Sequence, residues 1–112
     1  MDKLEKYRNL IEKILTEHAS EPYSYGDIKS QTIFDRERDQ YLLVDVGWNN
    51  KRFRVHGALV HVEIIDGKFW IQYDGIEDGI TTDLELAGVP KSDIVLAFHA
   101  PELRKYTDYA VA

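Results

Sequence analysis

The sequence predicts an α+β domain in which one antiparallel sheet packs against an N-terminal helix. Residues 41–74 are rich in Val, Ile and aromatic residues and are punctuated by turn residues. Within this stretch Asp66-Gly67 is a type I′ hairpin signal, because both central positions of that turn need a positive φ. Residues 2–18 instead repeat apolar side chains at helical spacing. Strands joined by such short turns can only be antiparallel, which gives the fold class.

The N-terminal helix is predicted from Asp2 to about His18. Asp2 and Glu5 fit a capping box, and His18 would suit the negative end of the helix as a cation. The apolar stripe comprises Leu4, Tyr7, Leu10, Ile11, Ile14, Leu15 and His18. A connection from Ser20 to Gly26 follows, with Pro22 and Gly26 as helix breakers.

The next strand is predicted over Ile28–Phe34. Its alternation places Ile28, Ser30, Thr32 and Phe34 on one side. The charged loop at residues 35–39 has nearly balanced charges, so a solvated hairpin end is favoured over a site. The length of this loop leaves the register of the first strand pair open.

A second hairpin is predicted around a two-residue turn at Asn49-Asn50, because Asn tolerates the left-handed region. The apolar pattern changes phase at Gly57, which predicts a β-bulge at or beside that residue. This register pairs Val46 with Phe53 and Val44 with Val55 on the core face, and Asp45 with Arg54 outside.

The hairpin at Asp66-Gly67 fixes the register of the following strands. On the core face it pairs Ile64 with Phe69, Val62 with Ile71, and Val60 with Tyr73. On the other face it pairs Ile65 with Lys68, Glu63 with Trp70, and His61 with Gln72. The ribbon residues expected to point inward are Val44, Val46, Val60, Val62, Ile64, Phe69 and Ile71.

Two helices and one strand are predicted after the ribbon. A helix at Thr82–Ala87, capped by Thr81 or Thr82, is ended by Gly88 and Pro90. The apolar run Ile94–Phe98 is typical of a strand buried on both faces. Pro101 then opens a last helix over Glu102–Tyr109, with Leu103, Tyr106 and Ala110 on its apolar side. We expect all three helices to cover the face that carries Val60, Val62 and Ile64.

Composition narrows the function classes. The chain has 112 residues, which predicts one domain over 1–112, and a net charge of −6. Without cysteine, disulfides and thiolate metal sites are excluded. No apolar run reaches membrane-spanning length and the start lacks a signal-peptide core, so we expect a cytoplasmic protein.

The charge distribution argues against direct binding to nucleic acid. Between Asp66 and Glu85 there are six acids and one base, and phosphate binding needs clustered Lys and Arg. The one basic cluster, Lys51-Arg52 with Arg54, is interpreted as a solvated hairpin tip.

The sequence contains metal-ligand residue types but no recognisable spacing. The acids at 74–78 do not match the alternating oxygen ligands of an EF-hand loop. We therefore predict no catalytic residues, no metal site and no cofactor. The residues weighed were His56, His61, His99, Glu63, Asp74, Glu77 and Asp78.

A working surface is predicted on the sheet face opposite the helices. Trp70 is a large indole that the register sets beside Glu63 rather than in the core, and exposed aromatics rimmed by charge are typical interface anchors. The candidate partner-binding residues are Trp70, Glu63, His61 and Gln72, beside Leu43, His56, Asp45 and Arg54. The partner would be a second copy or a companion protein. In the alternative, the segment Tyr106–Ala112 folds over Trp70 and extends the core.

Several long motifs resemble XisI-like proteins, over essentially the whole chain. They are Asp74-Gly-Ile-Glu-Asp-Gly-Ile, Ala87-Gly-Val-Pro-Lys-Ser-Asp-Ile-Val-Leu, Phe98-His-Ala-Pro, and Arg104-Lys-Tyr-Thr-Asp-Tyr-Ala-Val-Ala. The segment from Phe34 to Leu43, the Val46-Gly-Trp turn and Arg54-Val-His-Gly fit too.

The resemblance implies a cyanobacterial fdxN element excision controlling factor. Such a factor is an accessory protein in programmed DNA rearrangement, and a nuclease-like companion, XisH, is usually encoded beside it. Binding to that companion is the expected function. The alternatives are a metal-dependent nuclease-like enzyme and a weak direct DNA-binding module.

Overall fold

The computed structural model describes residues 2–21 and 26–112. In chain order the elements are α1 (Lys3–Ala19), β1 (Asp27–Asp35), β2 (Gln40–Trp48), β3 (Arg54–Ile65), β4 (Lys68–Asp74), α2 (Ile80–Leu86), the 3-10 helix η1 (Lys91–Asp93), β5 (Ile94–Leu96) and the 3-10 helix η2 (Pro101–Tyr106). The predicted breaker Pro22 lies outside the described residues.

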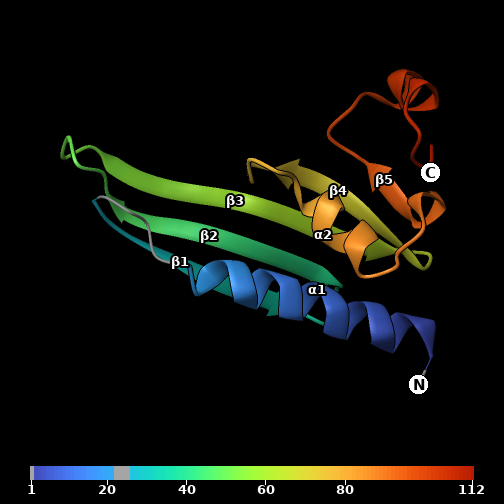
Figure 1. Ribbon diagram of the computed structural model, residues 1–112, viewed down its shortest axis with the longest axis horizontal. Coiled ribbons are helices and arrows are strands. Elements are labelled where there is room, and N and C mark those ends of the chain that lie inside the picture. Colours follow the sequence, from blue (N-terminus) through green and yellow to red (C-terminus); the bar gives the residue numbers. More distant parts are fainter. Residues whose placement is uncertain (1, 22–25) are drawn as a thin grey trace.

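One five-stranded sheet organises the fold, with the strands in the order β1-β2-β3-β4-β5. The first three pairs are antiparallel and β5 runs parallel to β4. Helices α1 and α2 lie on the same side of the sheet, and the β2–β3 hairpin extends beyond them at one end (Figure 1). The predicted α+β class is therefore confirmed.

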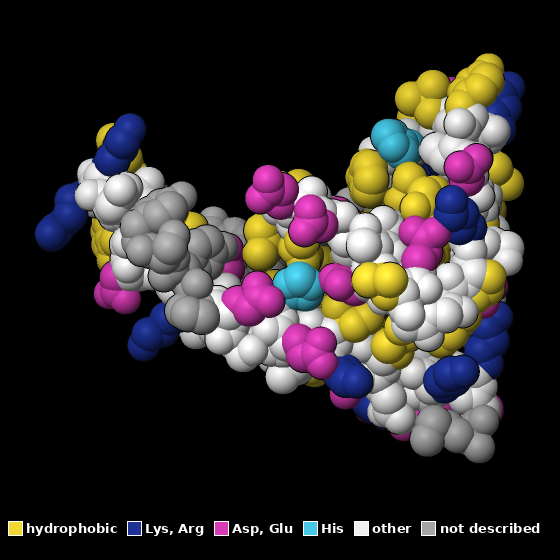
Figure 2. All heavy atoms as spheres, in the orientation of Figure 1, with side chains coloured by type: hydrophobic (Ala, Val, Ile, Leu, Met, Phe, Trp, Pro, Cys, Tyr) yellow, Lys and Arg dark blue, Asp and Glu magenta, His cyan; other side chains and the backbone are white. Residues whose placement is uncertain are grey.

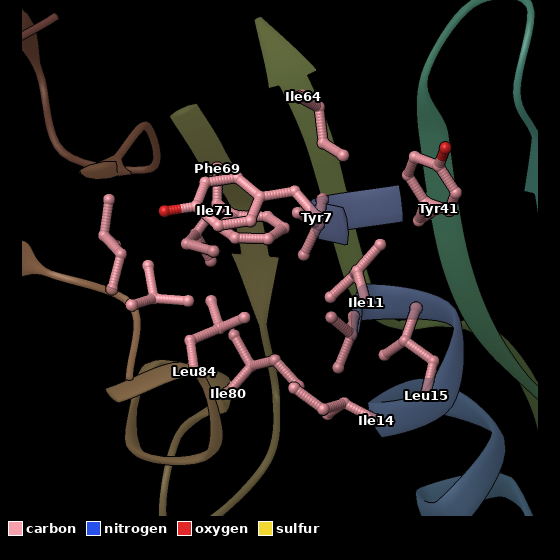
Figure 3. Packing of buried hydrophobic residues seen from close by; sticks show 14 of the residues in the cluster. Tyr7, Ile11, Ile14, Leu15, Tyr41, Ile64, Phe69, Ile71, Ile80 and Leu84 are labelled. Carbon is pink, nitrogen blue, oxygen red and sulfur yellow. The ribbon is translucent and has the colours of Figure 1, made fainter. Parts of the chain in front are cut away.

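The core lies between α1, α2 and the inner sheet face, by which we mean the face that these helices cover. From α1, Ile11 and Leu15 are fully buried, and the Tyr7 ring stacks on Phe69 with centroids 4.5 Å apart (Figure 3). Helix α2 adds Ile80 and Leu84, which are also fully buried. Burial of each such side chain contributes roughly 1.5–3 kcal/mol before the entropy cost.

The β3–β4 hairpin follows the predicted register near its turn. Asp66 and Gly67 both have positive φ, 51° and 76°, as a type I′ turn requires. Ile64 pairs with Phe69 and Val62 with Ile71, but Gln72 is then an extra residue in β4. The predicted pairs of Val60 with Tyr73 and of His61 with Gln72 are wrong, because this bulge shifts Tyr73 opposite His61.

The β2–β3 hairpin differs from the prediction. Its loop spans Asn49–Phe53 rather than two residues, so the register moves by three. An odd shift reverses the faces of a strand pair. Leu43 is consequently fully buried, whereas Val44 and Val46 lie on the face away from the helices.

The same shift undoes the remaining pairs predicted for this hairpin. Asp45 faces Gly57 instead of Arg54, is buried, and accepts a hydrogen bond from Ser30 Oγ at 2.6 Å. Phe53 sits in the loop and is 66% exposed. A bulge is present in β3, but the extra residue is Leu59, two positions beyond Gly57.

The loop after β4 is shaped by Asp74. Its carboxylate accepts hydrogen bonds from the backbone N–H groups of Ile76, at 3.2 Å, and Ile80, at 2.8 Å. Helix α2 begins at Ile80 with Gly79 as its N-cap residue, so the predicted caps Thr81 and Thr82 are wrong. The side chain that accepts from the first N–H of the helix is that of Asp74. Gly88, with φ 95°, ends the helix as predicted.

The C-terminal part is less helical than predicted. Strand β5 ends at Leu96, and Phe98 is 49% exposed. The last helix is a 3-10 helix, in which Leu103 and Tyr106 are exposed instead of forming an apolar side. Ala110 forms a parallel bridge with Val95 and so extends the edge of the sheet beyond β5.

Strand β1 has the predicted alternation, and the loop that follows it is tied to α1. Ile28, Ser30, Thr32 and Phe34 are the more buried side chains of β1. In the loop, Arg36 pairs with Glu12 at 2.7 Å, and Arg8 of α1 pairs with Asp39 at 2.7 Å. Within the described residues, no helix is long and apolar enough to cross a membrane.

Candidate functional site

The sheet face away from α1 and α2, here called the open face, is the candidate site. Over β1 to β4 its side chains are partly or fully exposed, whereas the inner face is buried at its centre, around Leu43, Val62 and Phe69. Register and bulges place on it Lys29, Gln31, Ile33, Gln40, Leu42, Val44, Val46, Trp48, Arg54, His56, Ala58, His61, Glu63, Trp70 and Tyr73.

The centre of the open face is apolar. Ile33 lies opposite Leu42, and Val44 lies opposite Ala58. Ile33 is 50% exposed, and Leu42 and Val44 are partly exposed. A sheet face toward water normally carries polar side chains, so this apolar strip is unusual for a solvent-facing sheet surface.

One end of the face is a polar patch around Trp70, which we call the Trp70 patch. His61 hydrogen-bonds the side chain of Gln40 at 2.6 Å, and Gln72 donates to Glu63 at 3.1 Å. Glu63 faces Trp70 across the strands. The structure thus brings the four candidate partner-binding residues, His61, Glu63, Trp70 and Gln72, into one patch.

The C-terminal segment covers part of Trp70. The Arg104 guanidinium lies 5.4 Å from the centre of the indole ring, and it donates to the carbonyls of His99 and Ala97. Helix η2 has no buried residue and contributes nothing to the core cluster, so it does not cover the inner face with α1 and α2. The expectation that all three helices share that face is therefore wrong. Trp70 remains partly exposed beneath this contact, and Tyr106 is 77% exposed.

Gln40 and Arg104 are members of the Trp70 patch that sequence reasoning does not identify. Gln40 faces Glu63 because β2 and β3 pair in the register set by the Asn49–Phe53 loop. The sequence predicts a two-residue turn there, and so a different register. The sequence pattern assigns Arg104 to a helix on the other side of the sheet. Of the other residues predicted beside the patch, Leu43 and Asp45 point into the core, and His56 and Arg54 lie toward the far end of the open face.

Ligand-type residues outside the open face do not assemble a metal centre. Across residues 2–21 and 26–112, no group of three or more His, Asp or Glu side chains is placed to hold an ion. The Asp74 carboxylate is engaged by the backbone N–H groups of Ile76 and Ile80, and His18 pairs with Asp83 at 2.7 Å. Glu77 and Asp78 line a groove of about 570 Å³ beside that pair, and the His99 ring packs on Phe98.

Comparisons with known proteins agree over the full chain. The family model described as "XisI protein" matches residues 1–111. A solved XisI-like protein from Anabaena variabilis is 41% identical, with a TM-score of 0.87, over 97% of this chain and 99% of that one. The solved fdxN element excision controlling factor XisI from the same organism is 35% identical, with a TM-score of 0.79, over 99% and 100%. The curated proteins contain no match.

Proposed function

The chain belongs to the XisI family, and from that premise we propose that it is a non-catalytic accessory protein that controls DNA excision by binding a companion protein through its open face. A solved relative is described as an fdxN element excision controlling factor. The companion is the nuclease-like XisH that the family resemblance implies.

The observation that carries this proposal is the uncovered apolar strip on the open face. Its members Ile33, Leu42 and Val44 form a continuous row of exposed or partly exposed side chains across β1 and β2. The strip ends at the Trp70 patch, where an indole is flanked by Glu63 and Arg104. An apolar centre with an aromatic anchor and a polar rim is the usual anatomy of a protein interface.

The test is co-purification of the companion with variants of this chain. Ile33→Asp puts a charge in the apolar strip at a side chain that is 50% exposed, so the core stays intact. We expect it to weaken companion binding at least tenfold. Trp70→Ala at the Trp70 patch should weaken binding similarly, because buried aromatic anchors carry most of an interface's affinity.

Leu86→Asp is the matched control. Leu86 is 82% exposed on α2, away from the open face, and receives the same change. It should bind like the wild type, while circular dichroism shows that all variants are folded. Equal binding by Ile33→Asp and Leu86→Asp would refute the proposal. So would an Ile33→Asp variant that abolishes self-association and leaves companion binding unchanged, since the face would then serve a second copy.

A further inference from the structure

The tip of the β2–β3 hairpin combines exposed aromatic and basic side chains. Trp48 is 48% exposed and Phe53 is 66% exposed. Lys51, Arg52 and Arg54 are exposed as well, and the Arg54 guanidinium lies 5.1 Å from the centre of the Trp48 ring. We call these five residues the tip. It projects past the helices, and basic side chains point outward from that end of the molecule (Figures 1 and 2).

The fold separates the tip from most of the acidic charge. The acidic loop after β4 meets β3 at Leu59, whose carbonyl accepts from the N–H of Gly75 at 2.7 Å. Leu59 lies five residue steps from Arg54 along β3, or about 17 Å at roughly 3.3 Å per residue. That exceeds the Debye length of about 8 Å at physiological salt, so the net charge of the whole chain does not determine the potential at the tip.

The local charge balance at the tip is positive. On the neighbouring strand β1, Asp27 faces Trp48 and Lys29 faces Val46. With Lys51, Arg52 and Arg54 of the tip, this end of the sheet carries four bases and one acid. The net charge of −6 argues against DNA binding by the surface as a whole. It does not argue against DNA binding at the tip, where the local charge is positive.

The loop that presents the basic residues is ordered by Asn49. Its side-chain oxygen accepts from the N–H groups of Lys51, at 2.9 Å, and Phe53, at 3.0 Å. Arg52 takes the left-handed conformation with φ 70°. A groove of about 630 Å³ lies beside the loop, lined by Gly26, Asp27, Trp48, Asn49, Asn50 and Arg52.

We propose that the tip is an arm that binds the DNA double helix. A two-stranded ribbon fits the major groove, which is about 12 Å wide. Lys51, Arg52 and Arg54 would neutralise phosphates, and the planar faces of Trp48 and Phe53 would pack against the sugar and base surfaces beside them. This inference goes beyond the proposed function and does not depend on it, because the tip lies at the other end of the open face from the Trp70 patch.

The test is fluorescence anisotropy of the whole chain with a labelled 20-base-pair duplex at several salt concentrations. We expect a dissociation constant on the order of 10–100 µM at 50 mM salt. The triple variant Lys51→Gln, Arg52→Asn, Arg54→Gln should bind at least tenfold more weakly. Three lost phosphate contacts should reduce the slope of log affinity against log salt by roughly 2.7.

A second triple variant, Lys6→Gln, Lys13→Gln, Lys105→Gln, removes the same charge from positions elsewhere on the surface. It should retain wild-type binding. The fluorescence of Trp48 tests for direct contact between the tip and the duplex. In the variant Trp70→Phe, Trp48 is the one tryptophan left in the chain, and adding the duplex should quench its fluorescence.

Three results would overturn the proposal: no binding by the wild type at 50 mM salt, equal losses in the two triple variants, or tip variants that weaken companion binding alone. The last result would assign the tip to the protein interface. Because the DNA assay contains no companion, its failure leaves the proposed function standing.

Discussion

Gly47 is the residue at which strands β1 and β2 approach too closely for a side chain. Its φ is 153°, and a Cβ atom built there would lie 1.9 Å from the carbonyl oxygen of Asp27. That oxygen belongs to the backbone and cannot move without displacing β1. Gly57, by contrast, has no positive φ, and no atom lies within 4 Å of the position that a Cβ would take there.

The two glycines should therefore respond differently to the same change. Gly47→Ala should destabilise the fold by at least about 2 kcal/mol, from backbone strain and overpacking. At roughly 4 °C per kcal/mol, the melting temperature should fall by about 8 °C or more.

Gly57→Ala, and equally Gly57→Val, should stay within about 0.5 kcal/mol of the wild type. A bulge at Gly57 would instead make these substitutions destabilising, but the bulge lies at Leu59. Thermal unfolding followed by circular dichroism distinguishes the cases. Similar melting temperatures for Gly47→Ala and Gly57→Ala would contradict the close approach of β1 and β2.

At the scale of the elements, turn chemistry decides which strand pairs sequence reasoning can place. Asp66-Gly67 allows one turn type, so the predicted β3–β4 register is correct next to it. Asn49-Asn50 also looks like a two-residue turn, but the Asn49 side chain hydrogen-bonds two later N–H groups and closes a longer loop. Nothing local in the sequence distinguishes these lengths, and the odd difference inverts every side chain of β2.

Turn chemistry also decides which residues of the candidate site can be placed from the sequence. The sequence assigns His61, Glu63 and Trp70 to the correct face because they lie close to the Asp66-Gly67 turn. It does not reveal the apolar strip, because the predicted register places Val44 and Val46 of β2 in the core. The contact of Arg104 with Trp70 joins residues distant in sequence through an irregular segment, for which no periodicity exists.

The loop between β1 and β2 is an element whose contribution depends on pH. The Arg8 guanidinium, helped by the Tyr41 hydroxyl, holds the pKa of the Asp39 carboxyl below its usual range. A lowered folded-state pKa means that the unfolded chain binds the proton more readily. The resulting stability is fully present above about pH 4, the unfolded value, and is lost as the pH falls through the folded pKa.

Asp39→Asn should remove this pH-dependent contribution. Asn tolerates the left-handed backbone at this position, where φ is 52°, so the substitution changes mainly the charge. We expect a loss of about 1 kcal/mol at pH 7 that is smaller at pH 2.5, because the Asp39 carboxyl takes up a proton as the pH falls through its folded pKa. Urea unfolding at both pH values measures it.

Glu37→Gln is the control for this measurement, because it removes a charge from an exposed position of the same loop. It should change stability little at either pH. The contrary result is a free energy of unfolding of Asp39→Asn that differs from that of the wild type by the same amount at pH 7 and pH 2.5. That result would show that the ion pair with Arg8 contributes no pH-dependent stability.

At the scale of the whole molecule, the helices divide the sheet into the inner face, which they cover, and the open face, which they leave uncovered. Helices α1 and α2 bury the inner face completely around Ile11, Leu15 and Phe69. The open face carries the apolar strip between Trp48 at one end and Trp70 at the other. Both proposals place their contacts on or beside this one surface, with the companion protein over the strip and the Trp70 patch, and DNA at the tip.

The most direct test of the open face is a chemical-shift titration of the isotopically labelled chain with the unlabelled companion. We expect the methyl signals of Ile33, Leu42 and Val44 and the indole signal of Trp70 to shift or broaden, while the exposed methyl groups of Leu86 on α2 do not change. Perturbations confined to α1 and α2, or none at a companion concentration that saturates binding in a pull-down, would contradict this expectation.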